Sequence, residues 1–114
     1  MANLTFNSAS TIDIARADDA ISDAIATPGD FKAIQVKVDG YASDTTGSIT
    51  LMQLNSMDNT QFDSELSATH LKTLRTERDK PIIHTVRADT RGVSHIKLLV
   101  VNGSGDQVTV TGVI

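Results

Sequence analysis

The chain has 114 residues, a length typical of one domain, and its formal net charge of −4 arises from 14 acidic and 10 basic side chains. The absence of cysteine excludes disulfides, thiolate metal ligands and cysteine nucleophiles. Because the basic residues are spread along an acidic chain, we expect no nucleic acid among its partners.

The N-terminal residues are expected to form an arm ahead of the folded domain. Residues 1–10 lack the basic start and the apolar run of a secretory signal, and no later apolar stretch approaches the ~20 residues that span a bilayer. We therefore predict a protein made in the cytoplasm, with no membrane partner. Residues 1–10 are interpreted as an arm available for strand-edge pairing, and residues 11–114 as a single β-sandwich domain.

The segment that follows the arm fits two structures. Its apolar residues have a helical spacing: Ile14, Ala17, Ile21, Ala24 and Ile25. The same segment can be divided into strands at Thr11–Ile14 and Ala20–Thr27, with a turn at Asp18 and Asp19. We favour strands because the rest of the chain has a β pattern and sandwiches need seven or eight strands, and a short N-terminal helix stays the alternative.

Five later segments have the pattern of β-strands. The alternation is clearest at Ile34, Val36 and Val38, which are separated by polar residues. The predicted strands are Phe31–Tyr41, Ser48–Leu54, Ile82–Ala88, His95–Val101 and Gln107–Val113. We expect the first two to be antiparallel neighbours. We expect the last two to form a hairpin through a loop that contains Gly103 and Gly105, because glycine adopts positive φ without strain.

The segment Gln61–Lys80 is polar and irregular, and we predict a long excursion with a short strand near Phe62–Leu66. A short helix at Ala68–Thr76 is the alternative, because Leu71 and Leu74 are three residues apart.

These elements predict an all-β fold, an antiparallel β-sandwich with a jelly-roll-like course and about seven or eight strands. The core must be aliphatic, because only four residues are aromatic: Phe6, Phe31, Tyr41 and Phe62.

No pattern in the sequence is typical of a catalytic or metal site. His70, His84 and His95 are too far apart for a local metal motif. The acidic residues between positions 13 and 30 do not match a twelve-residue calcium loop, and neither a G-x-S-x-G elbow nor a glycine-rich nucleotide loop occurs. We therefore predict that the protein is not an enzyme and binds neither a cofactor nor a metal.

Two predicted strands, Ser48–Leu54 and His95–Val101, are apolar on both faces. One face of each belongs to the predicted core, so the second face needs a covering. Two coverings stay open, the excursion Gln61–Lys80 of the same chain or another subunit. For a subunit interface, the candidate residues are Met52, Leu54, Leu99 and Val101 on the second faces, with Leu4 and Phe6 of the arm.

A resemblance to a known class of proteins lies in the succession of strands and turns after Ile21. The segments that carry it are Pro28–Phe31, Ala33–Val38, Gly47–Leu51, Asn59–Asp63, His95–Asn102 and Gln107–Thr111. This texture resembles the small virion β-sandwiches of tailed phages, the head decoration or cement proteins, which are typically trimers that clamp neighbouring capsid subunits. The resemblance implies a structural protein on the capsid surface of a virion. Its partners would be the major capsid protein and further copies of itself in a homotrimer.

The alternative function is a carbohydrate- or receptor-binding sandwich of a viral fibre or an adhesin. Sugar sites usually offer aromatic side chains, and this chain has Tyr41 and three phenylalanines but no tryptophan. The stabilisation of a capsid lattice is therefore our first hypothesis.

Overall fold

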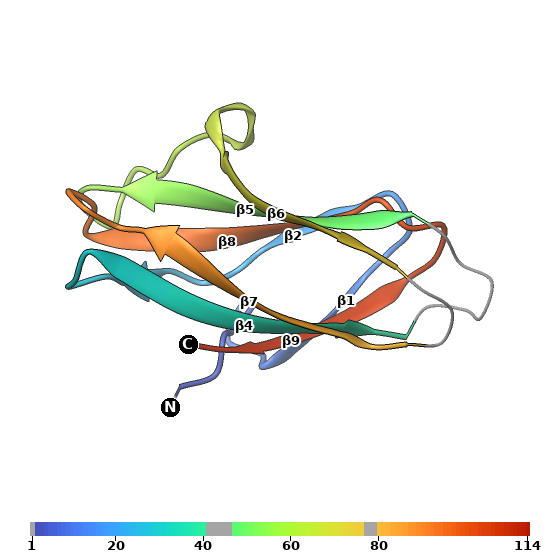
Figure 1. Cartoon of the computed structure of the whole chain (residues 1–114). Helices are drawn as coiled ribbons and strands as arrows, with labels where there is room; N and C mark the ends of the chain where they lie inside the picture. Colours follow the sequence, from blue (N-terminus) through green and yellow to red (C-terminus); the bar gives the residue numbers. More distant parts are fainter. Residues whose placement is uncertain (1, 41–46, 77–79) are drawn as a thin grey trace.

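The computed structural model describes residues 2–40, 47–76 and 80–114, and Figure 1 shows the arrangement of the strands. Within these ranges the elements are β1 (Thr11–Ile14), β2 (Asp19–Ile21), β3 (Ile25–Ala26), β4 (Phe31–Asp39), β5 (Ser48–Ser56), η1 (Glu65–Ser67), β6 (Thr69–Arg75), β7 (Ile82–Asp89), β8 (His95–Asn102) and β9 (Val108–Val113). The all-β prediction is confirmed. No helix in the described ranges has the length and apolar character that crossing a membrane requires.

The strands form two antiparallel sheets that face each other (Figure 1). The β4 sheet has the order β1-β9-β4-β7, and the β5 sheet has the order β2-β8-β5-β6, with β3 also paired to β8. Each sheet combines strands from both halves of the chain, as in a jelly roll built from two Greek keys. The predicted sandwich with a jelly-roll-like course is therefore confirmed.

Aliphatic side chains exclude water from the space between the sheets. In β4, Ile34, Val36 and Val38 are buried while the residues between them are not, so one face of this strand belongs to the core. The neighbouring and opposite strands supply the same kind of side chain: Leu51, Leu98, Val100, Val108 and Val110. Short aliphatic residues thus form a core that needs few aromatic rings.

Both strand pairings expected from the sequence are wrong. β4 and β5 lie in different sheets, and so do β8 and β9. After β8 the chain crosses the sandwich, and Asn102 holds this crossing: its amide donates to Ile14 O at 3.0 Å and to Asp106 O at 2.8 Å. Its Oδ1 accepts from Ser104 Oγ at 2.6 Å. The glycines of this loop therefore serve a change of sheet and not a hairpin.

The strand interpretation of residues 11–27 is confirmed, and the helical alternative is wrong. β1 pairs with β9, and β2 and β3 pair with β8, so two long strands hold this segment extended. Between β2 and β3, Ser22 stays in contact with Leu98. Its backbone N–H donates to the Leu98 carbonyl, and its hydroxyl accepts from the Leu98 N–H, both at 2.8 Å.

The excursion Gln61–Lys80 also differs from its prediction. The segment 68–76, which fitted a short helix, contains β6, which pairs with β5 and buries Leu74 in the core. In place of a strand near Phe62, a single bridge joins Phe62 to Ser56, and η1 follows. Pairing with the edge of β5 outweighs a helical spacing that is too short to be stable alone.

Residues 2–6 pack into the sandwich. The backbone N–H of Leu4 donates to Gly112 O at 2.9 Å, and Asn3 bridges to Val113, so this segment continues the line of β1 beside β9. The side chains of Leu4 and Phe6 are 1% and 2% exposed. The strand-edge pairing expected of the arm is therefore made within its own chain. An interface role for Leu4 and Phe6 would require the arm to leave its place.

The carboxylate of Asp23 fastens the turn that follows the buried part of the arm. Asn7 and Ser8 form a tight turn in the left-handed region, with φ of 50° and 70°. The Asp23 carboxylate accepts hydrogen bonds from their backbone N–H groups at 3.0 and 2.8 Å and from the Thr5 hydroxyl at 2.7 Å. The hydrogen bond from Thr5, followed by that from Ser8, keeps the pKa of Asp23 below its ordinary value of 3.8.

Replacing Leu98 by Ala tests the packing of the two sheets. The side chain is 1% exposed, so its removal leaves a cavity and should lower the free energy of unfolding by about 2–4 kcal/mol. Thr109→Ala is the control, because Thr109 is half-buried on the outer face and should contribute less than about 1 kcal/mol. Chemical denaturation measures both changes, and equal effects would show that the two faces are misassigned.

Asp23→Ala tests the attachment of the arm. We expect a loss of about 1–3 kcal/mol in the free energy of unfolding, with faster hydrogen exchange at residues 2–9. Because the pKa of Asp23 is lowered in the folded state, its contribution is complete above about pH 5 and is lost as the pH falls below about 4. The wild type and the variant should therefore converge in stability as the pH falls through the lowered folded-state pKa of Asp23. Asp30→Ala, which removes an exposed carboxylate, should show no such convergence.

Candidate functional site

The outer face of the β4 sheet is exposed, and we call this surface the open face. Phe31, Ala33, Gln35 and Lys37 point outward from β4 and are exposed, whereas the residues that alternate with Ala33, Gln35 and Lys37 are buried in the core. The register of the neighbouring strands puts further outward residues beside them: Ile83 and Thr85 on β7, Thr111 and Val113 on β9.

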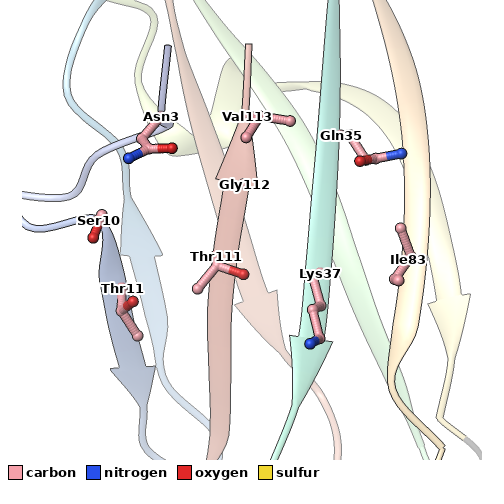
Figure 2. Close-up of a pocket in the computed structure, with 9 residues that line it drawn as sticks. All are labelled: Asn3, Ser10, Thr11, Gln35, Lys37, Ile83, Thr111, Gly112 and Val113. Atoms are coloured by element: carbon pink, nitrogen blue, oxygen red, sulfur yellow. The ribbon is translucent and has the colours of Figure 1, made fainter. Parts of the chain in front are cut away.

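A shallow groove with a volume of about 350 Å³ lies in the open face, and Figure 2 shows the side chains that surround it. Its lining residues come from the arm, β1, β4, β7 and β9: Asn3, Ser10, Thr11, Gln35, Lys37, Ile83, Thr111, Gly112 and Val113. Six of these nine residues carry an amide, hydroxyl or ammonium group, and two have aliphatic side chains. Such a surface offers donors and acceptors to a ligand that is itself rich in hydroxyl groups.

Two large apolar side chains interrupt the polar surface of the open face. Phe31 is 54% exposed and Ile83 is 61% exposed. The guanidinium of Arg87 lies over the Phe31 ring, 4.8 Å from the ring centroid. One face of the ring is therefore occupied by this cation. Ile83 lines the groove and supplies the larger apolar contact there (Figure 2).

A second cavity, more enclosed than the groove, lies between β5 and β6 of one sheet and β7 of the other, and we call it the edge cleft. Its volume is also about 350 Å³. Its lining residues are Gln53, Asn55, Thr69, Leu71, Arg87, Asp89, Arg91 and Val93. Two guanidinium groups, a carboxylate and a buried amide thus meet from segments that are distant in the sequence.

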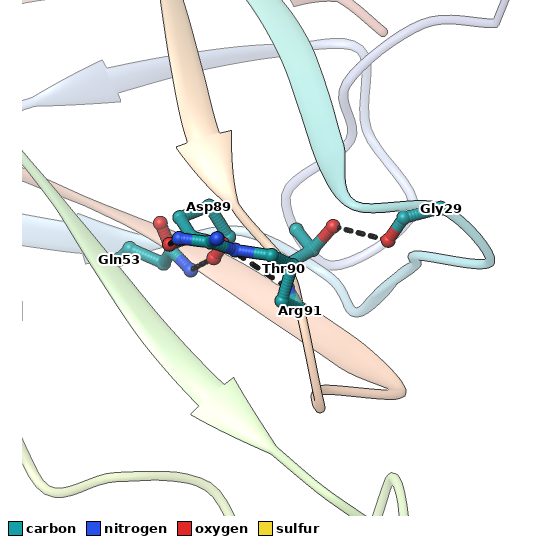
Figure 3. Close-up of polar contacts among 5 residues, drawn as sticks. All are labelled: Gly29, Gln53, Asp89, Thr90 and Arg91. Carbon is teal, nitrogen blue, oxygen red and sulfur yellow. Dashed lines mark hydrogen bonds and ion pairs between the residues drawn. The ribbon is translucent and has the colours of Figure 1, made fainter.

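Hydrogen bonds order the polar wall of the edge cleft (Figure 3). Arg91 donates from Nε and Nη2 to the Asp89 carboxylate at 3.0 and 2.7 Å, and Gln53 Nε2 donates to the Asp89 carbonyl oxygen at 2.8 Å. Thr90 Oγ1 donates to Gly29 O at 2.7 Å, which ties together the loops before β4 and after β7. The hydrogen bonds from Arg91 lower the pKa of Asp89 to about 2, so this carboxylate is ionised at neutral pH.

No family model matches the sequence, and no curated protein matches it. Solved structures match its fold. The chain is similar to a Clostridium thermocellum structure of the CBM22-1 and GH10 modules of xylanase 10B complexed with xylohexaose, with a TM-score of 0.56 and 13% identity over 92% of this chain. The chain spans 25% of the length of that protein.

Two further structures have lower TM-scores. The SPBc2 prophage-derived protein YomS has a TM-score of 0.43 and 14% identity over 90% of this chain and 89% of its own. The family 29 carbohydrate-binding module CBM29_1 of Piromyces equi has a TM-score of 0.44 and 12% identity over 85% of this chain and 64% of its own. At such identities the similarity concerns the fold alone.

The second apolar face of β5 and β8 is covered by the chain itself. Leu54 and Leu99, two of the predicted interface residues, are 3% and 2% exposed although they lie outside the core between the sheets. The segment 57–68 loops over this side of the β5 sheet (Figure 1). Its Phe62 is half-buried, with the ring 4.4 Å from the Lys97 ammonium on β8. The internal covering, one of the two that the sequence left open, is therefore present.

An accessible remnant of this apolar face surrounds Leu99. Met52 and Val101, the other two predicted interface residues on β5 and β8, are half-buried. Ile21 on β2 pairs with Leu99 and is 40% exposed. We call Ile21, Met52 and Val101 the outer patch. The role of the six predicted residues in a subunit interface stays a prediction, and the outer patch includes two of them.

The histidines lie on three different strands. His70 is hydrogen-bonded to Thr73 at 2.8 Å, and His95 Nδ1 to the Ser94 hydroxyl at 3.0 Å, while His84 is on β7. Across residues 2–40, 47–76 and 80–114, no three His, Asp or Glu side chains gather as a metal site requires. The expectations of no metal, no cofactor and no catalysis stay predictions.

Neither the open face nor the edge cleft was predicted from the sequence. Alternation does put Gln35 and Lys37 on one face of β4, but it does not identify the neighbouring strands. The edge cleft depends on the approach of Gln53 to the end of β7, which no local pattern marks. Tyr41, the aromatic residue considered for a sugar site, lies outside the described residues.

Proposed function

We propose that the chain is a non-catalytic binding domain that holds a carbohydrate against the open face. The groove is the observation that carries this proposal, because four segments of the chain contribute hydrogen-bonding side chains to it: the arm, β1, β4 and β9. Sugar hydroxyls both donate and accept hydrogen bonds. The amides of Asn3 and Gln35 and the hydroxyl of Thr111 can do the same, so the two surfaces match in kind.

The shape and the apolar residues of the groove also support a sugar ligand. A pyranose ring has an apolar C–H face, and the exposed Ile83 offers a surface of similar character beside the polar groups. The fold of this chain matches 25% of the xylanase structure complexed with xylohexaose, and this similarity is compatible with the ligand class. The choice of surface comes from the chemistry of the groove.

A structural role in a virion is the second candidate, and the outer patch favours it. Ile21, Met52 and Val101 remain accessible around Leu99, and Leu66 of η1 is also fully exposed. Clustered apolar side chains commonly mark contacts between proteins. A decoration protein would bind the assembled lattice through this patch and stabilise it by its binding free energy. A major capsid protein as partner, a homotrimer and a capsid-surface location belong to this second candidate.

Affinity electrophoresis through gels that contain soluble polysaccharides tests the carbohydrate proposal. Gln35→Ala should weaken retention at least about fivefold, because a side-chain hydrogen bond contributes on the order of 1 kcal/mol. Lys72→Ala on β6, in the other sheet, is the matched surface control and should bind like the wild type. A panel of neutral and acidic polysaccharides that retains nothing, or retention that Gln35→Ala leaves unchanged, would contradict the proposal.

Co-sedimentation with assembled capsids of the virus that encodes the chain tests the second candidate. Met52→Asp should abolish co-sedimentation, because it would bring an unpaired charge into an apolar contact. Gln35→Ala on the open face should leave co-sedimentation intact. A wild-type protein that never enters the pellet would remove this candidate.

A further inference from the structure

The floor of the edge cleft contains a buried acceptor without a donor. Gln53 is 2% exposed, and its Nε2 donates both to Asn55 Oδ1 at 2.6 Å and to Asp89 O at 2.8 Å. Within the described part of the chain, no hydrogen bond reaches its Oε1. Asn102, the other buried amide side chain of the core, uses both its nitrogen and its oxygen. Since buried polar atoms are nearly always paired, Gln53 Oε1 is suited to a ligand that donates a hydrogen bond.

The wall of the cleft offers unused cationic donors. Arg91 commits Nε and Nη2 to Asp89, which leaves its other N–H groups available. The Arg87 guanidinium rests on the Phe31 ring and makes no hydrogen bond to any residue in the described ranges. With Asp89 ionised, the two arginines leave one net positive charge at the mouth of the cleft. A ligand that enters here should therefore carry an anionic acceptor.

We propose that the edge cleft binds a hexuronate, with the sugar carboxylate held by Arg87 and Arg91 and a ring hydroxyl donating to Gln53 Oε1. This inference goes beyond the proposed function to a second site, and it rests on the proposed function only in taking the ligand to be a carbohydrate. A hexuronate carries the anionic acceptor and the hydroxyl donor on one ring. Leu71 and Val93 supply the apolar contact for the C–H face of that ring. The volume of about 350 Å³ fits a single sugar unit.

Titration followed by NMR, with galacturonate and with galactose, tests this inference. Galacturonate should bind at least about tenfold more tightly, shift the side-chain amide signals of Gln53 and lose affinity as salt is raised. Arg87→Gln should weaken galacturonate binding at least about fivefold. Arg16→Gln, which removes an exposed arginine before β2, is the matched control and should leave binding unchanged.

Asp89→Asn separates a ligand site from a purely structural cluster. The substitution removes the negative charge beside Arg91, so galacturonate affinity should rise roughly two- to fivefold. A cluster that only orders the loop would bind no more tightly after this change. Unchanged or weaker binding would overturn the inference, as would equal binding of galactose and galacturonate, or Arg87→Gln without effect.

Further arms distinguish the source of the ligand and separate the two proposals. If trigalacturonate binds more tightly than galacturonate, the ligand is a unit of an acidic polysaccharide. If the two affinities are equal, the ligand is the free sugar acid. Either result upholds the site. Lys37→Ala on the open face should leave galacturonate binding at the cleft intact. If polysaccharides are retained but galacturonate does not bind, the cleft proposal alone is overturned. If galacturonate binds but the retention of polysaccharides does not depend on Gln35, the open-face proposal alone is overturned.

Discussion

The molecule depends on the burial of two aliphatic faces that neither sheet can cover alone. Ile34, Val36 and Val38 of β4 belong to the same core as Leu98 and Val100 of β8. Because alternate side chains must point inward, the remaining ones are fixed on the outside of each strand. The ordered polar surface of the open face is thus a direct result of the packing inside. On the other sheet the same rule leaves apolar residues outside, and the chain folds a segment over them.

Strands were easier to predict than their partners. A period of two follows from burying one face, so alternation was sufficient to place β4, β7 and β9 near their observed bounds. It did not determine sheet membership, because a hairpin and a crossing between sheets require the same alternation and similar glycines. The pairing of β8 with β5 and of β9 with β4 distinguishes the two, and the contacts of Asn102 with distant backbone groups hold the crossing. For the segment that contains Leu71 and Leu74, the helical alternative was wrong, because this segment pairs with the edge of β5.

The candidate surfaces were harder to predict from the sequence than the fold was. The second apolar face around Leu99 was recognised, but its covering depends on the approach of Phe62 to Lys97, which no periodic pattern marks. The edge cleft joins Gln53 to Asp89, which are 36 residues apart and lie in opposite sheets. Such sites form where the order of the strands brings distant segments together. The order of the strands depends on many weak long-range contacts, which no local pattern in a single sequence reveals.

The arm forms one wall of the groove and is held in place by contacts outside it. Asn3 borders the groove, while Leu4 anchors the same segment in the core and Asp23 fastens the turn that follows it. Docking of the arm and binding of a ligand that touches Asn3 are coupled equilibria. The factor by which docking raises the affinity for the ligand equals the factor by which the bound ligand favours the docked arm. Protonation of Asp23, although this residue does not line the groove, would therefore weaken the attachment of the segment that carries Asn3.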